Sequence, residues 1–426
     1  MDNTHHFRDE IVTGEKQPRI SLDERTVLRD LAKRVAEIAA LPVMSERRRM
    51  WVRHNRLERV RPMVLVFPEG SWRELLPPSA LQCAGEQARR MEWALRSRIY
   101  YHQHLHDDAP IEGTWVVPRR ISNTGWGLAP QHIPSTEATG AWGFDPLILA
   151  PGDLGKLRFP LVEDDPSGSQ RDYEEAQELF GDILEVRSVG IRHVSFHLMS
   201  LYCQLRGLEQ VMWDMYDRPT MLHEAMAFLE EGNRQMVRQY EQMNLLTLNN
   251  DDTYHSSGGL SYSSELPAPG HNPAHVRPCD MWASAEAQEM AQVSPEMHAE
   301  FILPYEKRLL EPFGLNGYGC CEDLTHKLGD VLTIPHLRRV SISPFADVDA
   351  CADKLGKKAI FSWKPHPAHL VGDFDPHRIR AYIAHTLDVS GGCVVEMILK
   401  DTHTCESHPE RFTQWIEIAQ ELAARY

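Results

Sequence analysis

Short apolar segments alternate with helical patterns along the second half of the chain, and this alternation constrains the fold more than any other feature. The apolar segments have the length of buried strands, and apolar residues recur at helical spacing between them. Such an alternation indicates parallel strands joined by helical crossovers. The elements expected from residue 180 onward are strand 193–199, helix 207–243, strand 245–249, helix 284–312, strand 315–321, strand 339–343, helix 347–356, strand 359–363, helix 376–388, strand 393–399 and helix 409–425.

The number of strand–helix units predicts an α/β fold, and within that class a (β/α)8 TIM barrel. Before residue 180, the apolar run 63–67 suits a buried strand, and residues 78–106 have a helical pattern. Counted together, the chain offers about eight units, which favours a closed barrel over an open doubly wound sheet.

Three parts of the chain differ in pattern. Residues 1–60 are expected to form an N-terminal helical arm, which begins with a capping-box pattern at Ser21. Residues 61–426 are expected to form the barrel. Within them, residues 107–170 are rich in Gly, Pro and Trp and carry weak periodicity, which indicates a long insertion, either a lid or a β excursion.

Charge and composition exclude several classes of protein. Lys and Arg number 45 against 61 Asp and Glu, a net charge of −16, whereas nucleic-acid binding depends on clustered cations. No stretch of roughly 18 consecutive residues is apolar, so we expect no membrane span. The polar start lacks the apolar run of a secretory signal, and 8 cysteines in 426 residues are too sparse for a disulfide framework. We therefore expect a cytoplasmic protein without nucleic-acid or membrane partners.

Polar and reactive residues follow four of the expected strands. In a barrel the carboxyl ends of the strands face the catalytic mouth, so we expect these residues to converge. An ordinary strand-to-helix turn also favours Asp and Asn, and this alternative would explain any one of the four by itself. The catalytic candidates are Asp251, Glu322, Glu396 and Asp401, and the substrate-binding candidates are Asn250, His255, Lys364 and Lys400.

Glu396 is a lone carboxylate inside an apolar run. A buried carboxylate is costly unless it is paired. We therefore expect Glu396 to point inward toward a cation, with Lys400 or Lys364 as the partner.

The adjacent pair Cys320 and Cys321 is a candidate metal site, because zinc takes thiolate and imidazole ligands. The predicted zinc ligands are Cys320, Cys321 and His403, and His255 and Cys405 could contribute from other loops. The chain has neither a CxxC nor an HExxH motif. Two alternatives remain open: a free thiol that packs as a small hydrophobe, and a Cys–His nucleophile.

Several segments together resemble the uroporphyrinogen decarboxylase superfamily, in particular its decarboxylase-like branch related to cobamide-dependent methyltransferases. They span most of residues 50–420. The segments are Arg53-His-Asn-Arg-Leu57 with Arg61-Pro62, Ser294-Pro-Glu-Met297, Tyr318-Gly-Cys-Cys-Glu322, Leu337-Arg-Arg-Val-Ser-Ile-Ser-Pro344, Lys364-Pro365, Glu396-Met-Ile-Leu-Lys-Asp401 and Pro409-Glu-Arg-Phe-Thr-Gln-Trp415.

The resemblance implies a (β/α)8 barrel and a methyltransferase. Such an enzyme would move a methyl group from a small methylated compound, for example a methoxylated one, to a corrinoid cofactor or a corrinoid protein. A metal or an acid would activate the leaving heteroatom. The implied cofactors are zinc and a corrinoid, the implied partners are a small-molecule methyl donor and a corrinoid protein, and a homodimer is compatible with this picture.

The chain departs from the superfamily at the cysteine pair. Methyltransferases of this group carry a His-x-Cys at this strand end, whereas here no His lies two residues before Cys320 or Cys321. The motif therefore does not bring zinc with it. Two other functions stay open: a decarboxylase or lyase in which Lys364 and Lys400 hold carboxylates, and a non-catalytic barrel that binds a corrinoid or tetrapyrrole.

Overall fold

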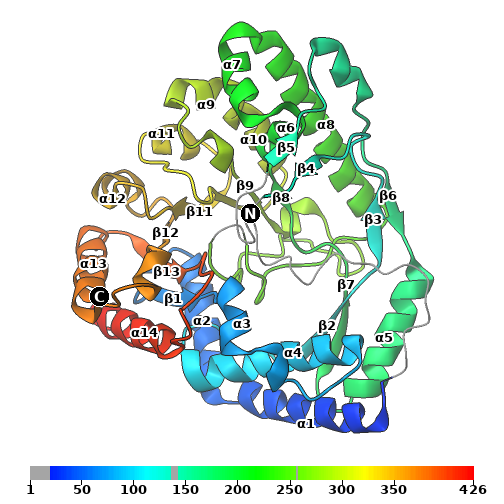
Figure 1. Ribbon diagram of the computed structural model, residues 1–426, viewed down its shortest axis with the longest axis vertical. Helices are drawn as coiled ribbons and strands as arrows, with labels where there is room; N and C mark the ends of the chain where they lie inside the picture. Colours follow the sequence, from blue (N-terminus) through cyan, green and yellow to red (C-terminus); the bar gives the residue numbers. More distant parts are fainter. Residues whose placement is uncertain (1–19, 136–142, 256–257) are drawn as a thin grey trace.

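The computed structural model describes residues 20–135, 143–255 and 258–426. Short strands alternate with helices along the chain, and Figure 1 shows the helices arranged outside the strands. The strands are β1 (Met63–Val66), β2 (Thr114–Pro118), β3 (Ile121–Asn123), β4 (Gln131–Ile133), β5 (Gly143–Asp145), β6 (Val162–Asp164), β7 (Glu185–Val189), β8 (Ser195–Phe196), β9 (Trp282–Ala285), β10 (Leu315–Tyr318), β11 (Leu337–Ile342), β12 (Ile360–Trp363) and β13 (Val394–Leu399).

The helices fall between and around these strands. They are α1 (Leu22–Ala39), α2 (Pro42–Asn55), α3 (Trp72–Leu75), α4 (Glu86–Tyr100), α5 (Pro166–Phe180), α6 (Leu198–Arg206), α7 (Leu208–Asp217), α8 (Pro219–Gln242), α9 (Pro295–Phe301), α10 (Leu303–Leu310), α11 (Leu328–Val331), α12 (Val348–Leu355), α13 (Pro376–Val389) and α14 (Glu410–Ala423). No helix of the described residues is long and apolar enough to cross a membrane.

The central sheet has seven strands in the order β1-β13-β12-β11-β10-β9-β8. All of its neighbouring pairs run parallel. The predicted α/β class with parallel strands and helical crossovers is therefore confirmed. Because every strand points the same way, all seven carboxyl ends lie along one edge of the sheet.

The two faces of this sheet differ in chemistry. Successive side chains of a strand point to opposite faces. Trp363 and its neighbour Met397 belong to the large apolar core that packs against the helices. The next pair in register, Ser362 and Glu396, points to the inner face and is fully buried. The inner face of the sheet thus carries buried polar side chains.

The sheet is not closed into a ring by strand pairing within the described residues. β1 and β8 stand at its two ends. Along the β1 edge, the carboxylates of Asp107 and Asp108 accept hydrogen bonds from the backbone N–H groups of Val66 (3.0 Å) and Val64 (2.8 Å), in place of a neighbouring strand. The closed eight-stranded barrel therefore stays a prediction.

The range 107–170 holds the β excursion that its composition suggested. β3 pairs with β6, and β4 with β5, both antiparallel. β2 lies in the same range but pairs in parallel with β7, so it is part of the regular alternation rather than of an insertion. Part of the range, residues 136–142, lies outside the described residues, and the lid stays a prediction.

The largest differences from the expected elements concern three segments. Residues 245–249 form only an isolated bridge, between Leu246 and Ile191. The helix expected over 284–312 begins instead as strand β9, and helix α9 starts only after the cap at Ser294. The strand expected over 193–199 is limited to β8, because α6 already begins at Leu198.

The N-terminal helices are packed into the rest of the chain. Ser21 and Glu24 form the expected capping box at the start of α1. Leu28 on α1 is fully buried in an apolar cluster with residues of α4, α5, β2 and β7. α2 contributes Trp51, which is fully buried beside Met63 on the inner side of the sheet.

Candidate active site

Reactive side chains converge along the edge where the parallel strands end. They follow β8, β9, β10, β12 and β13, whose carboxyl ends lie along the same edge of the sheet. We call them the mouth cluster. Its members are His197, Glu286, Cys320, Cys321, Glu322, Lys364, Lys400 and Asp401.

The two cysteines lie at the centre of this cluster. Their Sγ atoms are 3.6 Å apart, and the Cys321 Sγ lies 3.9 Å from an Asp401 carboxylate oxygen. They follow Gly319, whose φ of +91° lies in the region that favours glycine. The hydrogen bond from Cys320 lowers the pKa of the Cys321 thiol, and the same bond, together with burial, raises that of Cys320. Cys321 is therefore the more acidic thiol.

Glu322 and Glu286 form a buried pair of carboxyl groups. Glu322 accepts hydrogen bonds from the backbone N–H groups of Cys320 (2.8 Å) and Ala287 (3.3 Å). Burial and the charge of Glu286 raise the pKa of Glu322 to about 7. Glu286 in turn pairs with the His197 imidazole. Glu322 can therefore gain or lose a proton near neutral pH.

The pKa values of the two lysines of the cluster are shifted in opposite directions. Lys364 is 3% exposed, and burial lowers its pKa to about 7. Its ammonium group donates to the backbone oxygen and hydroxyl of Ser362, both at 2.8 Å. Burial would also lower the pKa of Lys400, but nearby Tyr254, Cys320 and Asp401 outweigh it and raise that pKa. Lys400 is thus a fixed cation, whereas Lys364 can act as an acid or a base.

Glu396 points inward and faces a cation, as expected, but the partner is not a lysine. Arg339 on β11 donates two hydrogen bonds to its carboxylate, at 2.8 and 3.1 Å, and His54 on α2 donates a third at 3.0 Å. Burial alone would raise the pKa of Glu396, but Arg339 and His54 outweigh it and lower that pKa. The expected pairing with Lys400 or Lys364 was wrong. Arg339, which lies two strands away on β11, forms the ion pair with Glu396 instead.

Asn250 and Asp251 lie away from the mouth cluster. The preceding residue, Asn249, accepts a hydrogen bond from the backbone N–H of Trp282, the first residue of β9 (2.9 Å), which is at the amino end of that strand. Asn250 donates to the Leu266 oxygen at 2.8 Å, and Asp251 pairs with Arg192. The structure therefore does not join these two candidates to the cysteines.

His255 lies in the interior of the molecule, beside β9, rather than in the mouth cluster. It is fully buried, its ring stands 6.0 Å from that of Trp282, and burial lowers its pKa well below the usual value. Tyr254, one residue earlier, packs against Phe67 at the carboxyl end of β1, with ring centroids 4.6 Å apart. Tyr254 is also one of the groups that raise the pKa of Lys400.

The predicted zinc ligands do not come together as a set. His403 is exposed, and its backbone oxygen accepts from Arg73 at 3.2 Å. Cys405 is buried elsewhere, and its thiol donates to Glu74 at 3.1 Å. Among the described residues, no group of three His, Cys, Asp or Glu side chains is placed to hold a metal ion. The donor set does not fit a zinc site with three protein ligands, so zinc enters no step below.

Sequence reasoning missed three residues of this region: Glu286, His197 and Arg339. Glu286 was missed because residues 284–312 were expected to form one helix, whereas Glu286 directly follows strand β9. The signal that could have revealed Arg339 is alternation, since Arg339, Ser341 and Ser343 fall on every second position of one strand segment. Polar residues at that spacing mark a polar face.

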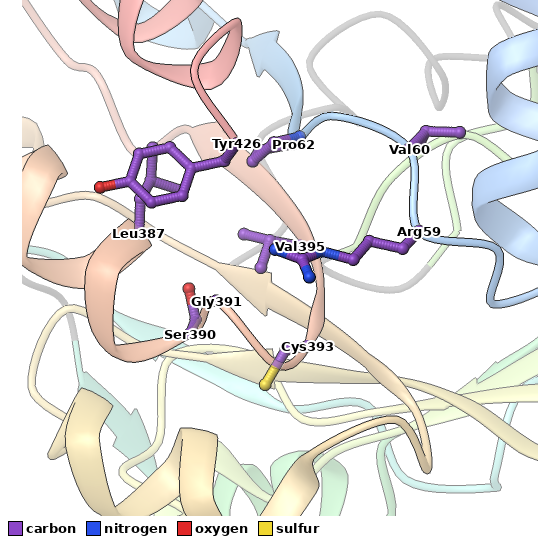
Figure 2. Close-up of a pocket in the computed structure, with 9 residues that line it drawn as sticks. All are labelled: Arg59, Val60, Pro62, Leu387, Ser390, Gly391, Cys393, Val395 and Tyr426. Carbon is purple, nitrogen blue, oxygen red and sulfur yellow. The ribbon is translucent and has the colours of Figure 1, made fainter.

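A separate small pocket lies on the opposite, amino-terminal side of the sheet. It is formed by the segment before β1, the end of α13, the start of β13 with the turn between them, and the last residue of the chain (Figure 2). It contains none of the predicted site residues. The lining residues are Arg59, Val60, Pro62, Leu387, Ser390, Gly391, Cys393, Val395 and Tyr426.

Comparisons with known proteins give no family. No family model matches the chain, and no curated protein matches it. Among solved structures, a methyltransferase from Methanosarcina mazei aligns with a TM-score of 0.45 and 11% sequence identity, over 87% of this chain and 97% of that one. A likeness of this degree carries no information about activity.

Proposed function

We propose that the protein is an enzyme that removes a methyl group from a small methylated compound and passes it to a corrinoid on a partner protein. The observation that carries the proposal is the mouth cluster, in which two groups with pKa values of about 7, Glu322 and Lys364, lie beside a thiol pair and a fixed cation. The resemblance of the sequence segments to cobamide-dependent methyltransferases supports the choice of methyl transfer.

Proton supply is the chemical task that this cluster suits. When a methyl group leaves an oxygen, nitrogen or sulfur atom, that atom takes the bonding electrons and is a poor leaving group unless it is protonated. A general acid works best when its pKa lies near the working pH. Protonated Lys364 or Glu322 can donate that proton, and Lys400 stabilises negative charge that develops beside it. A corrinoid, when bound, supplies the reduced cobalt that accepts the methyl group.

The test uses the purified chain with hydroxocobalamin, a titanium(III) reductant and a panel of methoxylated aromatics, methylamines and methyl thioethers. We expect methylated cobalamin to form with at least one donor. Lys364→Met should lower the rate by roughly 100-fold, the lower range for loss of a general acid. Lys357→Met, at an exposed position, is the matched control and should keep the rate. No product from any donor, or an unchanged rate in Lys364→Met, contradicts the proposal.

A second candidate, a carboxy-lyase, is favoured by one specific observation. Two largely buried ammonium groups, Lys364 and Lys400, face the same mouth and could hold a substrate carboxylate. Such an enzyme would release CO2 without corrinoid or reductant. Release of labelled CO2 from a panel of aromatic and tetrapyrrole carboxylates, with no cobalamin present, would favour it over methyl transfer.

A further inference from the structure

Cys320 and Cys321 have an arrangement that goes beyond proton supply. They are adjacent in sequence, both are half-buried, and neither is part of a disulfide. Their Sγ atoms lie 3.6 Å apart. A disulfide bond is about 2.05 Å long, so the two sulfurs need to approach by only about 1.5 Å.

We propose that Cys320 and Cys321 are a redox pair, which a peroxide closes to a disulfide between adjacent residues and a thiol reductant reopens. The disulfide itself does not depend on the function proposed above. Only its consequence, loss of turnover at the mouth cluster, rests on that function.

The chemistry balances with hydrogen peroxide as the oxidant. One thiolate attacks a peroxide oxygen, the O–O bond breaks, and a sulfenic acid and hydroxide result. The second thiol attacks the sulfenic sulfur, an S–S bond forms, and the oxygen leaves as water. In total, two thiols and one hydrogen peroxide give one disulfide and two water molecules. Sulfur is oxidised, and the peroxide oxygens are reduced.

Geometry makes this disulfide easy to reverse. The Cα atoms of adjacent residues are about 3.8 Å apart across a trans peptide, shorter than the separation of roughly 4.4–6.8 Å that disulfides usually span. Such a bond is strained. Strained disulfides have more oxidising potentials, and they are the labile ones. We therefore expect a pair that reopens readily, as a switch requires.

Closure would disturb the mouth through the backbone of Cys320. Its N–H donates to Glu322 at 2.8 Å, and its carbonyl oxygen accepts from the Ser341 hydroxyl at 2.7 Å. Drawing the two sulfurs together pulls the peptide between the cysteines, whose carbonyl is held by Ser341, and it turns the Cys320 backbone, whose N–H lies in the preceding peptide and is held by Glu322. Oxidation should therefore loosen the hydrogen bond between the Cys320 N–H and the Glu322 carboxylate.

The first measurement is mass spectrometry of the full chain after limited hydrogen peroxide, alkylation with N-ethylmaleimide and digestion with trypsin. Residues 309–327 form one tryptic peptide that contains only these two cysteines. We expect this peptide to be lighter by two hydrogen atoms and to carry no maleimide. After dithiothreitol it should carry two. The half-buried Cys279, which has no adjacent cysteine, is the internal control and should remain alkylated.

The second measurement is hydrogen exchange of the same peptide, which we expect to become faster on oxidation and to recover on reduction. The inference is overturned if the peptide still takes two maleimides, gains oxygen as sulfinic acid, or is joined to another cysteine. It is equally overturned if the disulfide forms and exchange is unchanged. Formation of the disulfide in a protein with no methyl transfer would remove the proposed function and leave the redox pair in place.

Discussion

Glu396 keeps its charge in the interior because three hydrogen bonds from Arg339 and His54 replace water around it. Both the carboxylate and the guanidinium are buried, with side chains 0% and 1% exposed. Burial makes each charge depend on the other, since neither can be solvated alone.

Replacing Glu396 with alanine should therefore be strongly destabilising. It would leave the Arg339 guanidinium buried without its partner, and breaking a buried pair in this way costs about 3–5 kcal/mol. Urea-induced unfolding followed by circular dichroism measures the free energy of unfolding. The matched control is Glu178→Ala: Glu178 pairs with Arg25 but is 75% exposed, so its loss should cost at most about 1 kcal/mol. Equal effects of the two substitutions would contradict this account.

The sequence predicted part of this arrangement. A single carboxylate in an apolar run can be recognised as buried and paired, because isolation in such a run is costly. Which cation reaches it depends on the register between β13 and its neighbours and on the packing of α2, which no local pattern contains. The lysines closest in sequence were therefore the wrong choice.

At the scale of elements, strand β9, which directly precedes Glu286, was missed because most of its residues are small. Residues 283–285 are Ala-Ser-Ala, which favour helix more than strand by intrinsic propensity. Pairing with β8 and β10 on both sides overrides that preference. By contrast, β11, β12 and β13 were predicted within one or two residues, because their apolar and β-branched runs are bounded by turn residues.

The segment that carries Gly258 and Gly259 fills the interior beside the buried pair. A Cβ on Gly258 would lie 1.8 Å from the Arg339 Cδ, and one on Gly259 would lie 2.5 Å from a Glu396 carboxylate oxygen. Only glycine lets this backbone pass so close to the two charged side chains. The requirement for these two glycines is therefore steric.

Gly258→Ala should therefore lower the free energy of unfolding by about 1–3 kcal/mol, the usual cost of overpacking an interior. The matched control is Gly392→Ala, where no atom lies within 4 Å of the added methyl group, and its effect should stay within about 0.5 kcal/mol. Thermal and urea unfolding of both variants would measure the difference. A Gly258→Ala protein as stable as the parent chain would show that Arg339 can move aside freely.

At the scale of the whole molecule, β1 shows why the count of strand–helix units does not decide whether the sheet closes. Its free edge is occupied by the Asp107 and Asp108 carboxylates, and Asp108 is in turn paired with Arg61. Side chains therefore take up hydrogen bonds that a neighbouring strand would otherwise make. The count of apolar runs carries no information about such a substitution, whereas the parallel direction of the strands does follow from the crossovers.

The stability of the whole chain should depend on pH in two stages. Asp107 and Glu322 have pKa values raised by burial to about 7, so the folded state binds their protons first and gains stability as pH falls from about 7 toward 4. Buried His298 has a pKa lowered to about 4, and those of His54 and His255 are also lowered. These histidines stay neutral when folded and reduce stability as pH falls below about 6.5. The two sets oppose each other between about pH 7 and about pH 4.5.

Below that range only losses remain. Hydrogen bonds from the backbones of Gly85 and Ser21 lower the pKa of Glu24 to about 2. Burial would raise the pKa of Glu74, but hydrogen bonds from Thr404, Ser407 and Cys405 lower it to about 2. The pKa of Glu396 is lowered too. Such carboxylates stabilise the fold above their unfolded pKa of about 4.3, and this stabilisation is lost as pH falls through the folded values. We therefore expect the free energy of unfolding, measured with urea, to change little between about pH 7 and about pH 5 and to fall steeply below about pH 4. Glu396→Gln should make the steep part of this pH dependence shallower, because its amide does not titrate. A uniform decline of the free energy of unfolding from neutral pH in the parent chain would contradict the opposing action of the buried carboxyl and imidazole groups.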